Sequence, residues 1–112
     1  MEVTITKSKK KDKKFDANIK SKGSDKNISF GASGYSDFTK HKDDKRKERY
    51  INRHKKNENW NTSGIDTAGF YSKHLLWNKD SFDKSFKNLK KKFPTVNFTY
   101  KQSEVILYEC TN

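Results

Sequence analysis

Residues 67–94 read TAGFYSKHLLWNKDSFDKSFKNLKKKFP, and this stretch contains all the residues of the expected helical core. Its second half carries an apolar residue at intervals of four, three and four, a spacing that predicts an amphipathic helix. Asp80 or Ser81 begins that helix, and Pro94 ends it. A second helix over about 67–77 is the most apolar segment, with Ser63, Asp66 or Thr67 as its cap. The expected core consists of the apolar residues of both helices: Phe70, Leu75, Leu76, Trp77, Phe82, Phe86, Leu89 and Phe93.

Alternating apolar and polar residues, typical of strands, flank these helices on both sides. Residues 2–6 are β-prone and predict a short strand. Residues 14–31 predict a β-hairpin, because two alternating runs surround a turn signal at residues 22–25. Two further alternating runs, at residues 96–100 and 105–109, predict a second hairpin.

The composition fits one small domain with a core made largely of rings. The chain has 112 residues, of which 29% are hydrophobic and 13% are aromatic. Since each buried ring removes roughly 150–250 Å² from water, a few rings replace many aliphatic side chains. We therefore expect an α+β fold, with two or three helices packed on β-hairpins in a single small domain over residues 14–112. Residues 1–13 are expected to form a basic N-terminal extension.

The charge is strongly positive and unevenly distributed. The formal net charge is +12. Residues 1–56 hold 18 basic and 8 acidic residues, a net charge of +10, whereas residues 57–112 hold 8 and 6, a net charge of +2. Because such an excess attracts anionic partners, we expect an acidic binding partner that contacts mainly the N-terminal half.

A cationic stripe is the clearest binding signal in that half. Residues 43–57 predict a helix, and basic residues recur along it at steps of four, three, four and three. This spacing places five cations on one side: Lys42, Arg46, Arg49, Arg53 and Lys56. They suit phosphate groups or an acidic protein surface. The alternative is a solvated helix face neutralised by pairs of charges four residues apart.

A second candidate site lies in the lysine-rich run at residues 7–14. We expect its lysines to contact a nucleic acid or to fill a groove on another protein. The residues concerned are Lys9, Lys10, Lys11, Lys13 and Lys14. The alternative is an unstructured, solubilising tail.

The sequence holds no recognisable catalytic or metal site. His41, His54 and His74 are too scattered for a zinc pattern, and Cys110 is the single cysteine. Residues 31–34 lack the spacing of a phosphate-binding loop. No run approaches the ~20 apolar residues that span a bilayer. We therefore expect no enzymatic activity, cofactor, bound metal, small-molecule substrate or membrane span.

Five spaced segments together resemble a family of small basic proteins from nucleocytoplasmic large DNA viruses, the giant viruses. The similarity covers about residues 14–93, and the family has no established activity or catalytic residues. The segments are FGASGYSDFTKHKD (30–43), RYINRH (49–54), ENW (58–60), TAGFYS (67–72) and LLWNK (75–79).

The resemblance implies a viral protein made in the cytoplasm or nucleus of an infected cell. In that setting we expect a virion structural protein, a minor capsid protein that binds acidic surfaces of neighbouring capsid or virion proteins. The alternative is a sequence-independent protein that binds double-stranded DNA or packages the genome. A cationic surface fits both partners, because carboxylates and phosphates are both anionic.

Overall fold

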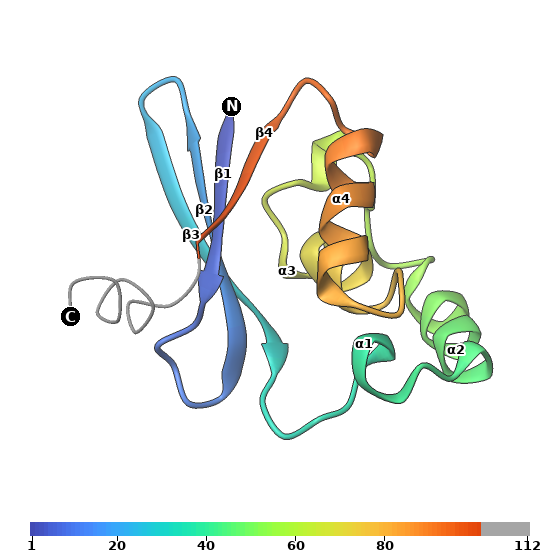
Figure 1. Cartoon of the computed structure of the whole chain (residues 1–112). Coiled ribbons are helices and arrows are strands. Elements are labelled where there is room, and N and C mark those ends of the chain that lie inside the picture. Colours follow the sequence, from blue (N-terminus) through green and yellow to red (C-terminus); the bar gives the residue numbers. More distant parts are fainter. Residues whose placement is uncertain (102–112) are drawn as a thin grey trace.

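The computed structural model describes residues 1–101, which form one four-stranded sheet covered by helices (Figure 1). The predicted α+β class is confirmed. In chain order the elements are β1 (Glu2–Lys7), β2 (Lys13–Ser21), β3 (Ser24–Ala32), α1 (Phe38–His41), α2 (Asp44–His54), the 3₁₀ turn η1 (Thr62–Gly64), α3 (Ala68–Tyr71), the π-helical turn η2 (Ser72–Leu76), α4 (Phe82–Lys92) and β4 (Asn97–Lys101).

The strands lie in the order β3-β2-β1-β4, and only the pairing of β1 with β4 is parallel. Their register aligns the apolar residues on one face. Val3 pairs with Ile19 on one side and with Phe98 on the other. Phe15 pairs with Phe30. Since side chains alternate between the faces of a strand, this register gives the sheet one apolar face.

α3, η2 and α4 lie against that apolar face, and the core fills the space between them and the sheet, whereas α2 lies farther from the strands (Figure 1). Half of the predicted core is fully buried, namely Phe70, Leu75, Leu76 and Leu89. The other half is partly buried and packs against the core, namely Trp77, Phe82, Phe86 and Phe93. The sheet contributes the remainder, including Val3, Ile5, Ala17, Ile19, Phe30 and Phe98.

Side-chain caps explain where three helices begin. Asp43 accepts hydrogen bonds from the backbone N–H groups of Lys45 and Arg46, and it therefore caps α2. Thr67 caps α3, and Ser81 caps α4 through the N–H of Lys84. Thr67 and Ser81 are among the residues that the sequence offered for those two positions.

The helix predicted over 67–77 is not uniform. It begins as α3 and continues as η2, in which the Trp77 N–H donates to the Ser72 carbonyl at 3.1 Å. This wider turn lies against α4 and α3 and carries the buried residues His74, Leu75 and Leu76. The short helix α1 was not predicted, because four residues are too few to show a periodic pattern.

The structure corrects the predicted N-terminal extension over residues 1–13. β1 lies inside the sheet, between β2 and β4, and buries Val3 and Ile5 almost completely. The physical reason is that two β-branched residues on one face of a strand gain most by joining the apolar face of the sheet. Of the predicted second hairpin, the first strand exists as β4, and residues 105–109 lie outside the described residues.

His74 is a buried polar residue of this core, and it gives stability a pH dependence. Its Nε2 lies 2.9 Å from the carbonyl of Trp60, and its Nδ1 has no partner within residues 1–101. Burial lowers the pKa of His74 to about 4, and the nearby ammonium groups of Lys73 and Lys92 act in the same direction. The native state therefore holds His74 neutral above about pH 4.

We expect stability to fall as the pH drops from about 6.5 to about 4. In that window the unfolded chain protonates His74 while the folded chain does not, which removes about 3 kcal/mol. Unfolding by urea at several pH values measures the change. The variant His74→Gln should lose this part of the slope, whereas His54→Gln should keep it. Equal slopes in the wild type and His74→Gln would show that His74 does not titrate in this way.

Candidate anion-binding surfaces

Helix α2 presents three guanidinium groups to solvent. Tyr50 is buried and stacks on Trp77, with ring centroids 4.3 Å apart and planes 3° apart, which fixes the helix against the domain. Lys47 donates to the carbonyl of Asn78 at 2.5 Å and so adds a second attachment. Three of the exposed side chains on the rest of α2 form what we call the arginine face: Arg46, Arg49 and Arg53.

Within residues 1–101, no carboxylate forms an ion pair with the arginine face. Within residues 1–101 the ion pairs involve Lys14, Lys26, His54 and Lys84, and none involves an arginine. The charge pairs that the alternative expects therefore do not include these arginines in the described part of the chain. Three unpaired guanidinium groups on one helix suit an external anion.

The predicted stripe is shorter than five residues. Lys42 precedes α2 and ends α1 in a left-handed conformation, with φ of 56°. Lys56 follows the end of α2 in a turn. Both are exposed, but neither belongs to the helix, because Asp43 starts α2 and its last helical residue is His54. The stripe on the helix is therefore the arginine face alone.

The lysine-rich run is the connection between β1 and β2, not an arm. The N–H of Ser8 donates to the carbonyl of Lys14 at 3.1 Å, which closes the hairpin. We call the exposed lysines of this connection the basic loop: Lys9, Lys10 and Lys11. Lys13 begins β2 and is half-buried. A hairpin loop holds these charges close to the sheet, as a flexible tail would not.

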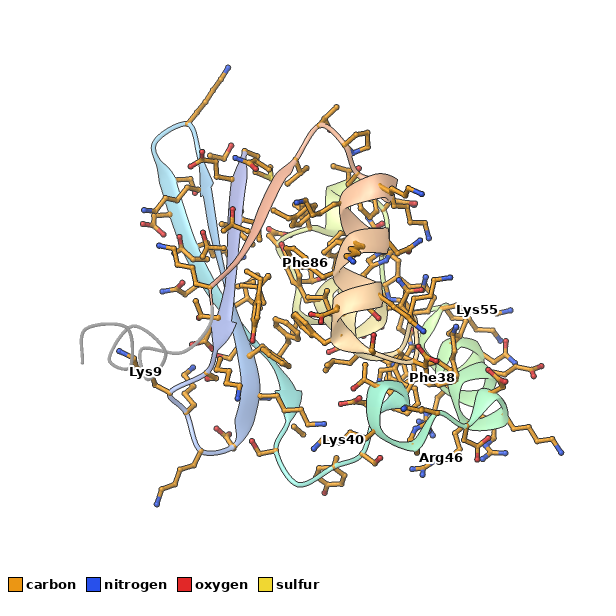
Figure 2. The ribbon with its side chains drawn as sticks, viewed as in Figure 1. Lys9, Phe38, Lys40, Arg46, Lys55 and Phe86 are labelled. Carbon is orange, nitrogen blue, oxygen red and sulfur yellow. The ribbon has the colours of Figure 1, made fainter. Side chains whose placement is uncertain are left out.

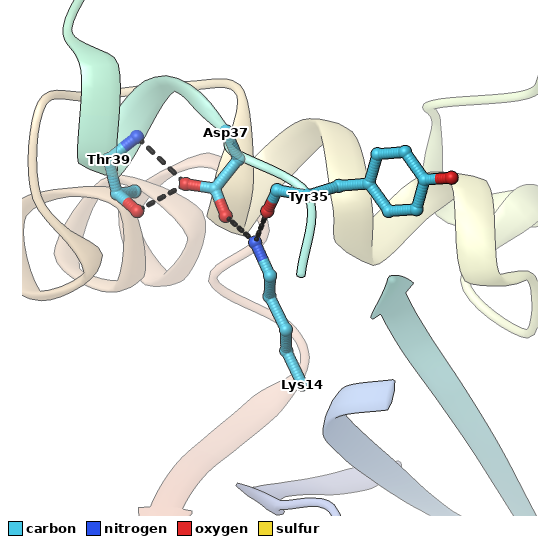
Figure 3. Close-up of polar contacts among 4 residues, drawn as sticks. All are labelled: Lys14, Tyr35, Asp37 and Thr39. Carbon is cyan, nitrogen blue, oxygen red and sulfur yellow. Dashed lines mark hydrogen bonds and ion pairs between the residues drawn. The ribbon is translucent and has the colours of Figure 1, made fainter. Parts of the chain in front are cut away.

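Lys14 does not belong to any external site, which corrects the prediction for that residue (Figure 3). Its Nζ lies 2.6 Å from the carboxylate of Asp37 and 2.6 Å from the carbonyl oxygen of Tyr35. The side chains of Lys14 and Asp37 are only 13% and 3% exposed. An ammonium group held in this way is a structural cation, because a buried carboxylate needs a paired charge.

The same carboxylate fixes the loop that carries Tyr35. Asp37 also accepts hydrogen bonds from the N–H and the hydroxyl of Thr39, and it thereby caps α1 (Figure 3). The N–H of Ser33 donates to the carbonyl of Asp12 at 3.0 Å, which ties the start of the loop to the β1–β2 connection. Between these two attachments the side chain of Tyr35 is 73% exposed.

The predicted site residues do not converge on one point. Figure 2 places Lys9 of the basic loop and Arg46 of the arginine face on opposite sides of the molecule, with Lys40 of α1 between them. The Tyr35 loop joins β3 to α1, and the N–H of Ser33 links it to Asp12 of the β1–β2 connection. The two sets of predicted cations therefore form separate surfaces, and the exposed ring of Tyr35 lies on the loop before α1.

The prediction missed a further cationic surface, on α4. An open hollow of about 710 Å³ is lined by one amide and five lysines. We call it the lysine hollow, and its residues are Lys79, Lys84, Lys87, Asn88, Lys90 and Lys91. The spacing of Lys84, Lys87 and Lys91 along the predicted helix was the available signal. The net charge of +2 over residues 57–112 concealed it, because acids elsewhere in that half balance these lysines.

Residues 1–101 hold neither a metal-binding cluster nor a membrane-spanning helix. No cluster of three or more histidine, cysteine or acidic side chains is arranged to hold a metal ion there. In the same part of the chain, no helix combines the length and the apolar character needed to cross a bilayer. The cationic surfaces are thus the leading candidate sites on the described residues.

Comparison with known proteins relates part of the chain to a protein family. No curated protein and no solved structure matches the chain. The matched segment runs from β1 to the end of α2, and it therefore includes the basic loop, the Tyr35 loop and the arginine face. Over this segment, residues 3–54, the chain is similar to a family described as "Family of unknown function (DUF5754)".

Proposed function

We propose that the protein is a non-enzymatic virion structural protein of a large DNA virus, a minor capsid protein that binds acidic surfaces of neighbouring capsid proteins. The supporting observation is that exposed cations occupy separate elements of one small rigid domain. A domain with separate cationic surfaces has room to contact more than one neighbour at the same time. The viral setting rests on the resemblance given above.

The exposed ring of Tyr35 supports the proposal of a protein partner. Tyrosine and arginine are enriched among the residues that contribute most to protein–protein binding, because each offers a large contact area together with polar groups. Here Lys14 donates to the carbonyl of Tyr35, so the backbone that carries the exposed ring is held before a partner arrives. A loop whose backbone is already ordered loses less entropy on binding than a mobile one.

Sequence-independent binding of double-stranded DNA is the second candidate. The observation in its favour is the arginine face, whose three guanidinium groups have no carboxylate partner within residues 1–101. Each phosphate contact would release a counterion and make binding salt-dependent. The exposed ring of Tyr35 argues for protein more than for a duplex, because the bases of a duplex are stacked inside it.

Replacing the arginine face is expected to weaken partner binding. The triple variant Arg46→Ala, Arg49→Ala and Arg53→Ala should bind the major capsid protein of the same virus about tenfold more weakly, since each exposed charge pair contributes about 0.2–1 kcal/mol. Lys20→Ala, Lys22→Ala and Lys26→Ala together make a control with the same loss of charge on the β2–β3 hairpin. Surface plasmon resonance at about 100 mM salt measures both.

Two outcomes would count against the capsid role. One is that the protein is absent from purified, nuclease-treated virions. The other is that both triple variants bind the capsid protein as tightly as the wild type does. If the wild type instead binds a short DNA duplex, and the arginine variant flattens the salt dependence of that affinity by about three counterions, the DNA candidate is correct.

A further inference from the structure

The lysine hollow brings together cations from one side of α4 and from the segment before it. Its lining includes Lys79, Lys84, Lys87 and Lys91, together with Asn88. The Oδ1 of Asn88 accepts a hydrogen bond from Asn78 at 2.9 Å, which leaves the NH₂ group of Asn88 available as a donor.

Further lysines converge at the margin of the hollow. The ammonium group of Lys73, on η2, lies beside that of Lys92, on α4, and is also influenced by Lys47 of α2 and by Lys79. Lys79 both lines the hollow and lies near Lys73. Lys92 follows Asn88 of the hollow by one helical turn, so the lysines around Lys73 adjoin the hollow. The Nζ of Lys73 lies 5.5 Å from the ring centroid of Trp60.

This arrangement is electrostatically unfavourable without an anion. Burial lowers the pKa of Lys73 to about 8, and the like charge of Lys92 acts in the same direction. Asp80 offsets one charge of the hollow, through an exposed pair with Lys84 at 3.1 Å. Within residues 1–101, no ion pair joins a carboxylate to Lys73 or Lys92. An anion placed among these lysines would relieve their mutual repulsion.

The dipole of α4 explains only some of the lysine positions in and around the hollow. Lysines in the last turn of α4 complement the partial negative charge at that end. Lys84 lies near the opposite end, where the dipole favours acids. Lys79 precedes the helix, and Lys73 lies on another element altogether. Their common feature is proximity to the hollow and not a position that stabilises α4.

We propose that the lysine hollow, with Lys73 and Lys92 at its margin, binds an anion that carries several closely spaced phosphate groups. Phosphate groups suit this site because each offers three acceptor oxygens and about −1.5 to −2 charges, and because lysine binds phosphate as a point charge. All arginines of the chain lie elsewhere, on α2. The site is thus independent of the binding proposed for the arginine face.

The test uses sodium tripolyphosphate as the probe for the full-length protein. The midpoint temperature of unfolding should rise with tripolyphosphate by more than it rises with sodium chloride at equal ionic strength. By isothermal titration calorimetry, Lys87→Met together with Lys91→Met should weaken the affinity about tenfold or more, because charge-assisted hydrogen bonds to phosphate are lost.

Two matched variants separate a built site from general charge attraction. Lys20→Met together with Lys22→Met removes the same charge from the β2–β3 hairpin and should change the affinity by less than about twofold. Lys73→Met should weaken tripolyphosphate binding but keep or raise the midpoint temperature in the absence of the anion, because it removes a repelled charge. If Lys73 only stabilised the fold, the Lys73→Met substitution would lower that midpoint temperature.

Two results would contradict binding of a polyphosphate at the lysine hollow. An equal loss of affinity in the two double variants would overturn the proposal, as would a wild-type midpoint that tripolyphosphate raises no more than sodium chloride does. Given specific binding, a short DNA duplex that competes with tripolyphosphate assigns the phosphates to a polynucleotide. A duplex that does not compete assigns them to a small polyphosphate.

Discussion

Deletion of residues 1–7 is expected to leave the chain unfolded. These residues include β1, which pairs with β2 on one side and with β4 on the other. Their removal exposes two strand edges and takes Val3 and Ile5 out of the core, where they are 1% and 0% exposed. The two side chains alone contribute about 1.5–3 kcal/mol each, a large share of the stability of a small domain. Far-UV circular dichroism and the dispersion of amide NMR signals measure the loss.

A pair of substitutions on the same strand makes the matched comparison. Val3→Asp places a carboxylate in the core and should mimic the deletion, whereas Thr4→Asp changes the opposite face and should remain folded. A second control replaces Lys10 and Lys11 by serine, because the loop lies outside the core. A deletion variant that kept a cooperative transition at the wild-type temperature would contradict the central position of β1.

Replacement of Lys14 by methionine is expected to lower the free energy of unfolding by about 3–5 kcal/mol. Methionine preserves much of the length of the side chain but removes the charge, and it leaves Asp37 buried without its cation. Asp37 also caps α1, so the start of that helix and the position of Tyr35 should loosen together. Denaturation by urea measures the change in stability.

The control for this prediction is Lys11→Met, an identical change at an exposed position of the basic loop, which should alter stability by less than about 0.5 kcal/mol. Adding Asp37→Asn to Lys14→Met should recover part of the loss, because it removes the uncompensated charge and keeps a capping side chain. Equal stability of the two lysine variants would mean that Lys14 is an ordinary surface residue.

The elements that the sequence predicted well are those with a strong local pattern. The repeated spacing of Phe82, Phe86 and Leu89 predicted α4, and the turn at residues 22–25 predicted the hairpin of β2 and β3. Both patterns involve residues that are only a few positions apart in the sequence. Local spacing suffices there because the element buries the same face along its whole length.

The pairing of β1 was beyond the same approach. Alternation predicted a strand at residues 2–6, but it contained no information about the partners of that strand. The lysines that follow made the whole segment look like an extension. Both partners are set by tertiary packing, because Val3 must align with Ile19 and with Phe98 to complete one apolar face.

The candidate sites show the same division between local and tertiary information. The arginines of α2 were predicted correctly as exposed cations on one helix, because their spacing is local. Lys14 was assigned to a binding site because it continues a lysine run, yet its partner Asp37 lies 23 positions further along the chain. Net charge counted over half of the chain concealed the lysine hollow, because charges that are distant in space cancel in such a sum.

The parallel pairing of β1 with β4 has a consequence for the order of folding. Glu2 pairs with Asn97, so β1 lacks its partner on one side until β4, the last described strand, joins the sheet. During synthesis, β1, β2 and β3 emerge first and can form an antiparallel meander, but one edge of β1 stays open until the helices have been made. Contacts of such long sequence separation slow folding, because the entropy of closing the chain is lost before they form. We expect the docking of β4 to be the late step in the refolding of this protein.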